Sequence, residues 1–188
     1  MSQFKAFRGR LKRYFTAYGG WTAVLSSPLF LMSVALSAIG YSEWMQDKWS
    51  LLTQSLLPNL LGFSLGTYSI LFGLLTGRMR AALKTKKNAS EISYLDEINA
   101  TFFHFIFVQV IALLWAIIYN GSLLHDLAHA APQCFPFALT LYGYAAKIGG
   151  FIGYGLLIYS ISLAIASALV VYRLASIVDP APPHREGQ

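Results

Sequence analysis

Two histidines four positions apart, His125 and His129, are the residues most suited to chemistry in this chain, and Asp126 follows the first. Histidines at this spacing share one face of a helix and can bind zinc together. The zinc-protease motif, however, has Glu at the place of Asp126, and Pro132 shortens any helix that carries both histidines. We therefore expect no metal or other cofactor, and assign the pair to hydrogen bonding at an interface. An externally facing metal-dependent enzyme stays open as an alternative.

Signatures of other enzymes are missing from the sequence. The glycines lie inside apolar stretches instead of forming a phosphate-binding loop. Cys134 is the single cysteine, so it forms no disulfide within one chain, and its Pro and Phe surroundings suggest no catalytic partner. No Asp or Glu lies within the long apolar stretches, which disfavours a proton-coupled transporter, because such transporters use an intramembrane carboxylate. The sequence thus predicts a protein that is not an enzyme.

Three polar side chains lie inside apolar stretches: Asn59, His104 and Gln109. Because His104 and Gln109 are five residues apart, they point about 140° away from each other on a helix. The favoured interpretation is a set of separate hydrogen bonds between neighbouring helices. In the alternative, these residues line a water-filled path through the membrane.

The elements that position these residues are apolar helices. Of the 188 residues, 56% are hydrophobic and 12% are charged, and the mean hydropathy is +0.53. Four stretches without Asp, Glu, Lys or Arg exceed the roughly 20 residues that cross a bilayer. They predict an all-α polytopic membrane protein with one transmembrane domain, 21–172, and a disordered cytoplasmic tail, 173–188. The four expected spans are residues 21–40, 51–76, 98–120 and 148–172.

The charges predict the orientation of these spans. Twelve of the fourteen Lys and Arg residues lie at the N-terminus, in the loop 78–97 or in the tail, and the other two are Lys48 and Lys147. Positively charged loops stay in the cytoplasm, so both termini are expected on the cytoplasmic side of a bacterial inner membrane. The uncharged stretch 14–42 is too long for the apolar part of a cleaved signal peptide. The formal charge of +6 fits anionic lipids rather than nucleic acid.

Basic residues form two groups on the expected cytoplasmic side. Within residues 1–20, apolar residues recur every three or four positions, which predicts an amphipathic helix on the membrane surface. The expected contacts with lipid or with a cytoplasmic partner protein are Lys5, Arg8, Arg10, Lys12 and Arg13 in this helix, and Arg78, Arg80 and Lys84 in the middle loop.

Two boundaries follow from local patterns. Asn88 with Glu91 resembles a capping box, which predicts that the helix of the third span begins near Ser90. The apolar segment 137–146 is too short to cross a bilayer, so it is expected to be re-entrant, to lie on the surface or to belong to the last span.

Small residues form ridges along two of the expected spans. Their steps of three and four residues line up one face of a helix, along which another helix can approach closely. We expect the protein to form homo-oligomers through these ridges, although packing within one chain would use them equally well. The ridge residues are Gly62, Gly66, Ser69, Gly73 and Gly77 in the second span, and Gly149 and Gly153 in the fourth.

Two segments of the second and third spans read PNLLGFSLG at 58–66 and NATFFHF at 99–105. They resemble stretches of small uncharacterised bacterial inner-membrane proteins. The resemblance implies a four-span bacterial family, and some such families accompany phage-defence modules as membrane effectors. It transfers no functional residue, because the shared positions are mostly packing residues.

These observations favour a non-enzymatic, oligomeric inner-membrane protein that forms a pore or disrupts the membrane. Phage defence is the setting that the resemblance implies. Asn59, His104 and Gln109 are the expected lining, and anionic lipids are the expected surface partner. The main alternative is a membrane anchor that recruits a cytoplasmic protein through residues 1–19 and 78–97.

Overall fold

The computed structural model describes residues 3–88, 91–121, 126, 129 and 137–175. All regular elements in these ranges are helices, which confirms the all-α class predicted from the sequence. The expected tail beyond residue 175 lies outside the described residues. The helices are α1 (Gln3–Tyr18), α2 (Gly20–Leu25), α3 (Pro28–Ile39), α4 (Tyr41–Met45), α5 (Lys48–Leu74), α6 (Gly77–Thr85), α7 (Tyr94–Tyr119) and α9 (Ala138–Ala175).

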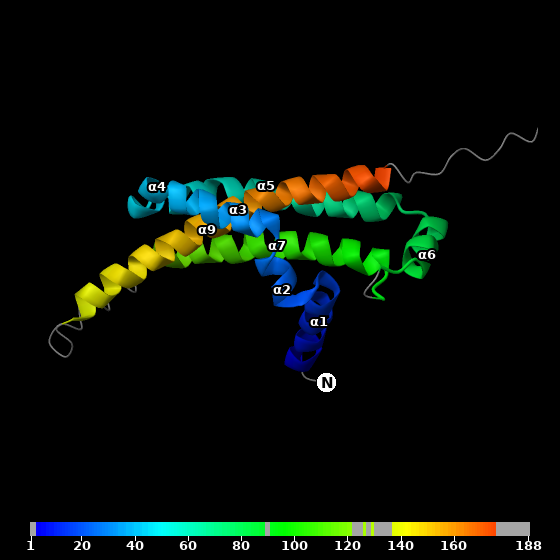
Figure 1. Ribbon diagram of the computed structural model, residues 1–188, viewed down its shortest axis with the longest axis horizontal. Coiled ribbons are helices and arrows are strands. Elements are labelled where there is room, and N and C mark those ends of the chain that lie inside the picture. Colours follow the sequence, from blue (N-terminus) through cyan, green and yellow to red (C-terminus); the bar gives the residue numbers. More distant parts are fainter. Residues whose placement is uncertain (1–2, 89–90, 122–125, 127–128, 130–136, 176–188) are drawn as a thin grey trace, which may run out of the picture.

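Three of these helices, α5, α7 and α9, are long and apolar enough to cross a membrane. α5 has 27 residues, α7 has 26, and the apolar part of α9, Leu139–Tyr172, has 34. At 1.5 Å per residue, each exceeds the roughly 30 Å of a hydrocarbon layer. They lie side by side in Figure 1, with α7 in contact with both of the others. By length and composition, these helices are compatible with a membrane protein.

The first expected span, residues 21–40, is not one continuous helix. This part of the chain forms α2, α3 and α4, and α3 has only 12 residues, or about 18 Å. The break lies at Pro28, the first residue of α3, because proline has no N–H to donate to the preceding turn. Ser27 has an extended backbone, with ψ 128°, as the residue before a proline prefers. α3 packs along α9, and α4 contacts both α9 and α5. The segment therefore packs on the bundle as separate short helices.

The starts of α7 and α9 differ from those expected. α7 begins at Tyr94, and its cap is Ser93, whose hydroxyl accepts a hydrogen bond from the Asp96 N–H at 3.1 Å. The Asn88 side chain instead accepts from the Ile92 N–H at 3.1 Å and closes the turn before the helix, so the predicted capping box is wrong. α9 is one helix of 38 residues, about 57 Å long, so residues 138–146 are neither re-entrant nor separate.

α7 lies at the centre of the packing, and α5 lies at its edge. In the most apolar window of each helix, 39% of α7 and 33% of α9 are buried inside the chain, but only 11% of α5. The buried apolar residues include Phe102 and Phe105 of α7, which pack against side chains of α5 and α9. α5 therefore leaves most of its surface without a neighbour from the described part of the chain.

The ridge pair Gly149 and Gly153 packs within the chain. The indole of Trp49 lies directly on Gly153, where an added Cβ would come within 2.1 Å of the ring. Tyr119 covers Gly149 in the same way, with 3.3 Å between its ring and an added Cβ. Trp49 is completely buried, so the glycines of α9 are the space into which its ring fits.

Candidate functional site

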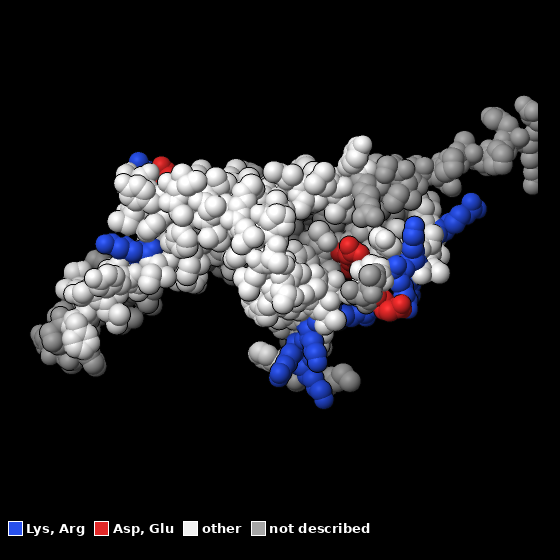
Figure 2. Space-filling model, in the orientation of Figure 1, with Lys and Arg blue, Asp and Glu red and all other residues white. Residues whose placement is uncertain are grey.

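The charged residues gather in two places: on α1, which projects from the side of the bundle, and around α6 at one of its ends. Figure 2 shows Lys and Arg side chains over α1 and around α6, and a long uncharged surface between them and the few charges at the α4 end. The α6 end also holds the start of α7 and the last turns of α9, because Val170 and Val171 pack near Ile98 and Leu83. The opposite end holds the start of α5 and the end of α7, where the Tyr119 hydroxyl donates to Asp47 at 2.5 Å.

α1 runs across the bundle rather than along it and projects from its side (Figure 1). None of its residues is fully buried, and Phe4 and Phe7 are 88% and 62% exposed. The five expected contact residues, Lys5, Arg8, Arg10, Lys12 and Arg13, are all exposed. Their arrangement fits the expected surface helix, and contact with lipid remains a prediction.

The second half of α1 docks on α7 through aromatic rings and one ion pair. The Tyr18 ring stacks on His104 with a centroid separation of 4.0 Å, and the Tyr14 ring meets Phe103 at 4.7 Å. The Arg13 guanidinium lies 3.7 Å from the Asp96 carboxylate at the start of α7. Burial, and next the nearby Tyr18, raises the pKa of the Tyr14 phenol, so this phenol stays protonated and can donate.

His104 joins three helices. Its Nδ1 lies 2.5 Å from the Tyr14 hydroxyl of α1, and its Nε2 lies 2.9 Å from the Tyr159 hydroxyl of α9. A neutral imidazole donates from one nitrogen and accepts at the other, so two hydroxyls satisfy it completely. We call His104, Tyr14, Tyr18 and Tyr159 the His104 cluster. The sequence predicted an interhelical hydrogen bond for His104, and this is confirmed.

Gln109 makes a separate interhelical contact. Its side-chain amide and the Ser64 hydroxyl of α5 lie within 3.2–3.3 Å, and both residues are buried. The two polar residues of α7 therefore serve different helix pairs, as their spacing predicted. The polar groups of both residues bind partners inside the chain. A single copy of the chain therefore does not form an open path lined by His104 and Gln109.

Asn59 differs from the other two polar residues because it is exposed. Its Nδ2 donates a hydrogen bond to the Ser55 carbonyl of its own helix at 3.3 Å. The predicted hydrogen bond to a neighbouring helix is not found for Asn59 among the described residues: its amide faces outward because α5 meets its neighbours with its other side.

The small-residue ridge of α5 is exposed along its whole length. An added Cβ at Gly62, Gly66 or Gly73 would meet no heavy atom within 4 Å. Gly77 does not belong to this ridge, because α5 ends at Leu74 and Thr76 caps α6. We call the remaining exposed residues the α5 seam: Ser55, Asn59, Gly62, Gly66, Ser69 and Gly73.

The basic residues of α6 divide into two kinds. Arg78 and Lys84 are exposed and point away from the described core, whereas the Arg80 guanidinium donates to the Phe72 carbonyl near the end of α5. Arg80 thus caps α5, which a cation near a helix C-terminus does well. Arg78 and Lys84 remain available as contact residues.

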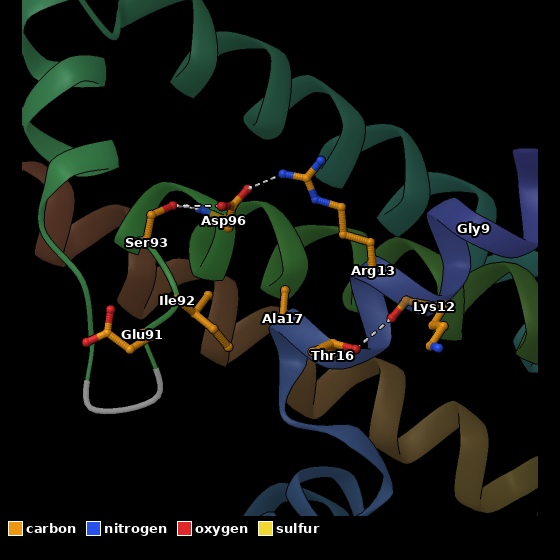
Figure 3. A pocket seen from close by; sticks show the side chains of 9 residues that line it. All are labelled: Gly9, Lys12, Arg13, Thr16, Ala17, Glu91, Ile92, Ser93 and Asp96. Atoms are coloured by element: carbon orange, nitrogen blue, oxygen red, sulfur yellow. Dashed lines mark hydrogen bonds and ion pairs between the residues drawn. The ribbon is translucent and has the colours of Figure 1, made fainter.

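A cleft of about 460 Å³ separates α1 from the turn before α7 (Figure 3). Lys12, Arg13 and Thr16 of α1 form one wall, and Glu91 and Asp96 lie on the other. The cleft therefore carries charges of both signs on the polar side of α1. No pattern in the sequence predicts this cleft, because its two walls are far apart in the chain.

The zinc hypothesis finds no support in the described residues. Among them, no group of three or more His, Cys, Asp or Glu side chains is placed to hold a metal ion. His125 and Cys134 lie outside the described residues, and His129 is exposed.

A comparison of the chain with protein-family models, with curated proteins and with solved structures found no match. Functional arguments therefore rest on the geometry of this molecule.

The hydrogen bonds of His104 give a first testable consequence. Replacing Tyr159 by phenylalanine should lower stability by about 1–3 kcal/mol, because it leaves a buried nitrogen without a partner. The midpoint of thermal unfolding in detergent measures the loss, with Tyr172→Phe as the matched control because Tyr172 is exposed. Equal midpoints for the two variants would show that the Tyr159–His104 contact does not stabilise the fold.

Proposed function

We propose that the protein is a multi-pass inner-membrane protein that self-associates through the α5 seam and, as an assembly, permeabilises the membrane. The observation that carries this proposal is the α5 seam itself, a continuous small and polar face on an apolar helix. The proposal has three parts: the topology, the association and the change in permeability. Each has its own support.

The topology we infer has four crossings, with both termini in the cytoplasm. The segment 20–45 starts beside α1, near the His104 cluster, and ends at the Asp47 end of the bundle. We infer that these three short helices together make up the first crossing. The chain then returns through α5, α7 and α9. The charge distribution supports the direction: α6 carries cations at one end of the bundle, and Arg13 of α1 meets Asp96 where α7 begins at that end. The positive-inside rule assigns this end to the cytoplasm.

The α5 seam supports self-association because this side of α5 is poorly suited to lipid. α5 has the lowest mean hydropathy of the three long helices, 1.3 against 2.2 for α7 and 2.1 for α9, yet it is the least buried. An outward-facing carboxamide at Asn59 is unfavourable in hydrocarbon, and a second copy of the chain offers it a partner. The spacing from Ser55 to Gly73 is four, three, four, three and four residues, an average of 3.6, which matches the α-helical repeat and keeps all six residues on one face of α5.

Of the three polar residues predicted to line a path, only Asn59 supports a change in membrane permeability. His104 and Gln109 are bonded within the chain, whereas the Asn59 amide is exposed to whatever lies beside α5. In an assembly whose copies meet along the α5 seam, this amide and the hydroxyls of Ser55 and Ser69 form the polar surface at the contact. Such a surface can hold water where an entirely apolar one would exclude it.

Leakage from liposomes tests this function. Reconstituted protein should dissipate a potassium gradient, and Asn59→Leu should reduce the rate by roughly tenfold or more, because the contact becomes apolar and dewets. Crosslinking of the same liposomes shows whether the variant still self-associates. If the wild-type protein is inserted and self-associated while the gradient holds, the permeability proposal fails, although association itself does not.

A second candidate function is a membrane anchor for a cytoplasmic partner protein. The cleft beside α1 and the exposed cations Arg78 and Lys84 favour it, since both lie on the end assigned to the cytoplasm. The two candidates predict opposite mutational patterns. Arg78→Gln with Lys84→Gln should abolish co-purification of a partner and leave leakage unchanged, and Asn59→Leu should do the reverse. Leakage lost in the double Gln variant would contradict this separation.

A further inference from the structure

α1 consists of two halves with different surroundings. The first half, Gln3–Arg10, is exposed at every residue and carries Lys5, Arg8 and Arg10 together with Phe4 and Phe7. Exposed aromatic rings beside several cations fit the surface of an anionic membrane, where rings enter the boundary and cations meet phosphates. The second half, Leu11–Tyr18, is partly buried against α7. One short helix therefore connects a lipid-binding surface with the bundle.

The joint between α1 and the rest of the chain is built from two glycines. Gly19 and Gly20 have φ values of +101° and +73°, which L residues with side chains rarely adopt. An added Cβ at Gly19 would also lie 2.9 Å from the Ala23 Cβ. Only glycine allows α1 to leave α2 in this direction, and the same two residues give the joint the widest range of backbone conformations.

The docked position of α1 depends on few contacts. Tyr14 bonds His104, Tyr18 stacks on it, and Arg13 pairs with Asp96 across partly exposed side chains, 81% and 46% accessible. The Arg13–Asp96 pair is largely solvent-exposed and therefore weak, so a second interaction on the same helix can shift the docking of α1. Because His104 also bonds Tyr159, the docked state of α1 is connected directly to α9.

We propose that α1 is a lipid-operated latch, in which binding of its first half to anionic lipid holds its second half on the His104 cluster. Lipid fixes the orientation of the helix, so less freedom is lost when Tyr14 and Tyr18 dock. The latch tightens contact between α7 and α9 when the cytoplasmic leaflet is rich in anionic lipid. The inference rests on the proposed topology, which puts α1 on that leaflet, and not on self-association or leakage.

Spin labels across the cleft beside α1 measure the state of the latch. Thr16→Cys and Ile92→Cys lie on its two walls, in a Cys134→Ser background, and are outside the docking contacts. Double electron–electron resonance in nanodiscs compares a zwitterionic bilayer with one that contains anionic phosphatidylglycerol. We expect the short-distance population to grow with anionic lipid. Neutralising Lys5, Arg8 and Arg10 to Gln should reduce the docked-to-undocked ratio by up to roughly fivefold per cation in the anionic bilayer.

Two controls make the result decisive. Arg78→Gln with Lys84→Gln removes exposed cations of α6 and should keep the response to lipid, whereas Tyr14→Phe with Tyr18→Leu should lower the short-distance population in either bilayer. Identical distance distributions in the two bilayers would overturn the latch. Crosslinking and leakage are measured on the same preparations. If the distances do not respond to lipid while crosslinking and leakage are retained, the latch is refuted and the proposed function stands.

Discussion

Replacement of Gly66 by leucine should leave the single chain folded and weaken its self-association strongly. No heavy atom of the described chain lies within 4 Å of an added Cβ at this position, so the isolated molecule leaves open space where the larger side chain begins. Between two α5 helices, however, the leucine would hold the backbones apart along the seam. Overpacking of this kind costs about 1–3 kcal/mol, so the dissociation constant should rise by roughly 5- to 150-fold.

Sedimentation equilibrium in detergent measures the dissociation constant, and Gly143→Leu is the matched control for Gly66→Leu. Gly143 is also a helical glycine with no atom within 4 Å of an added Cβ, but it lies on α9, away from the α5 seam. The control should associate like the wild-type protein. Equal dissociation constants for wild type and Gly66→Leu, or an equal loss in Gly143→Leu, would rule out the α5 seam as the contact.

The second large effect is expected at Gly153, where alanine should damage the fold itself. Its Cβ would lie 2.1, 2.4 and 2.6 Å from three carbons of the Trp49 ring, which is rigid and completely buried. Relief requires a shift of α5 against α9, so we expect a loss at the upper end of the 1–3 kcal/mol typical of overpacking. The midpoint of thermal unfolding should fall by about 6–12 °C on this scale.

A double-mutant cycle identifies the cause of this loss. Trp49→Leu removes the ring, so adding Gly153→Ala to it should cost far less than in the wild-type background. The indole N–H of Trp49 has no hydrogen-bond partner among the described residues, so the cycle measures shape rather than a lost polar bond. Gly155→Ala is the control, because its Cβ would make an ordinary 3.4 Å contact with Ser37. Strictly additive costs for Trp49→Leu and Gly153→Ala would contradict this explanation.

The sequence predicted the helical class and the long apolar helices because both depend on local composition. It did not predict the break in the first span, since an uncharged stretch has the same length whether Pro28 kinks one helix or begins a new one. The cap of α7 was misplaced for a related reason. Asn88 has the side chain of a cap, but the antiparallel bridge between Lys87 and Ser93 makes it part of a turn, and Ser93 takes the cap position.

Contacts between distant residues limited the prediction of the candidate site. Spacing alone showed that His104 and Gln109 need different partners, and the structure agrees. It gave no means to identify Tyr14, 90 residues away from His104, or Tyr159, 55 residues away. The two small-residue ridges likewise look equivalent in sequence. They differ in the fold because the Trp49 ring fills the surface at Gly153, while no described residue covers the α5 seam.

Cysteine crosslinking along α5 tests the self-association of this protein most directly. In a Cys134→Ser background, single cysteines at the seam positions 62, 66, 69 and 73 should form disulfides between copies in native membranes. Cysteines at Phe63, Ile70 and Leu74, which are equally exposed but lie about a quarter turn away, should not. We predict a crosslinking pattern that repeats every three to four residues and is centred on Gly66. A uniform pattern, or one centred on Phe63, Ile70 and Leu74, would contradict the account.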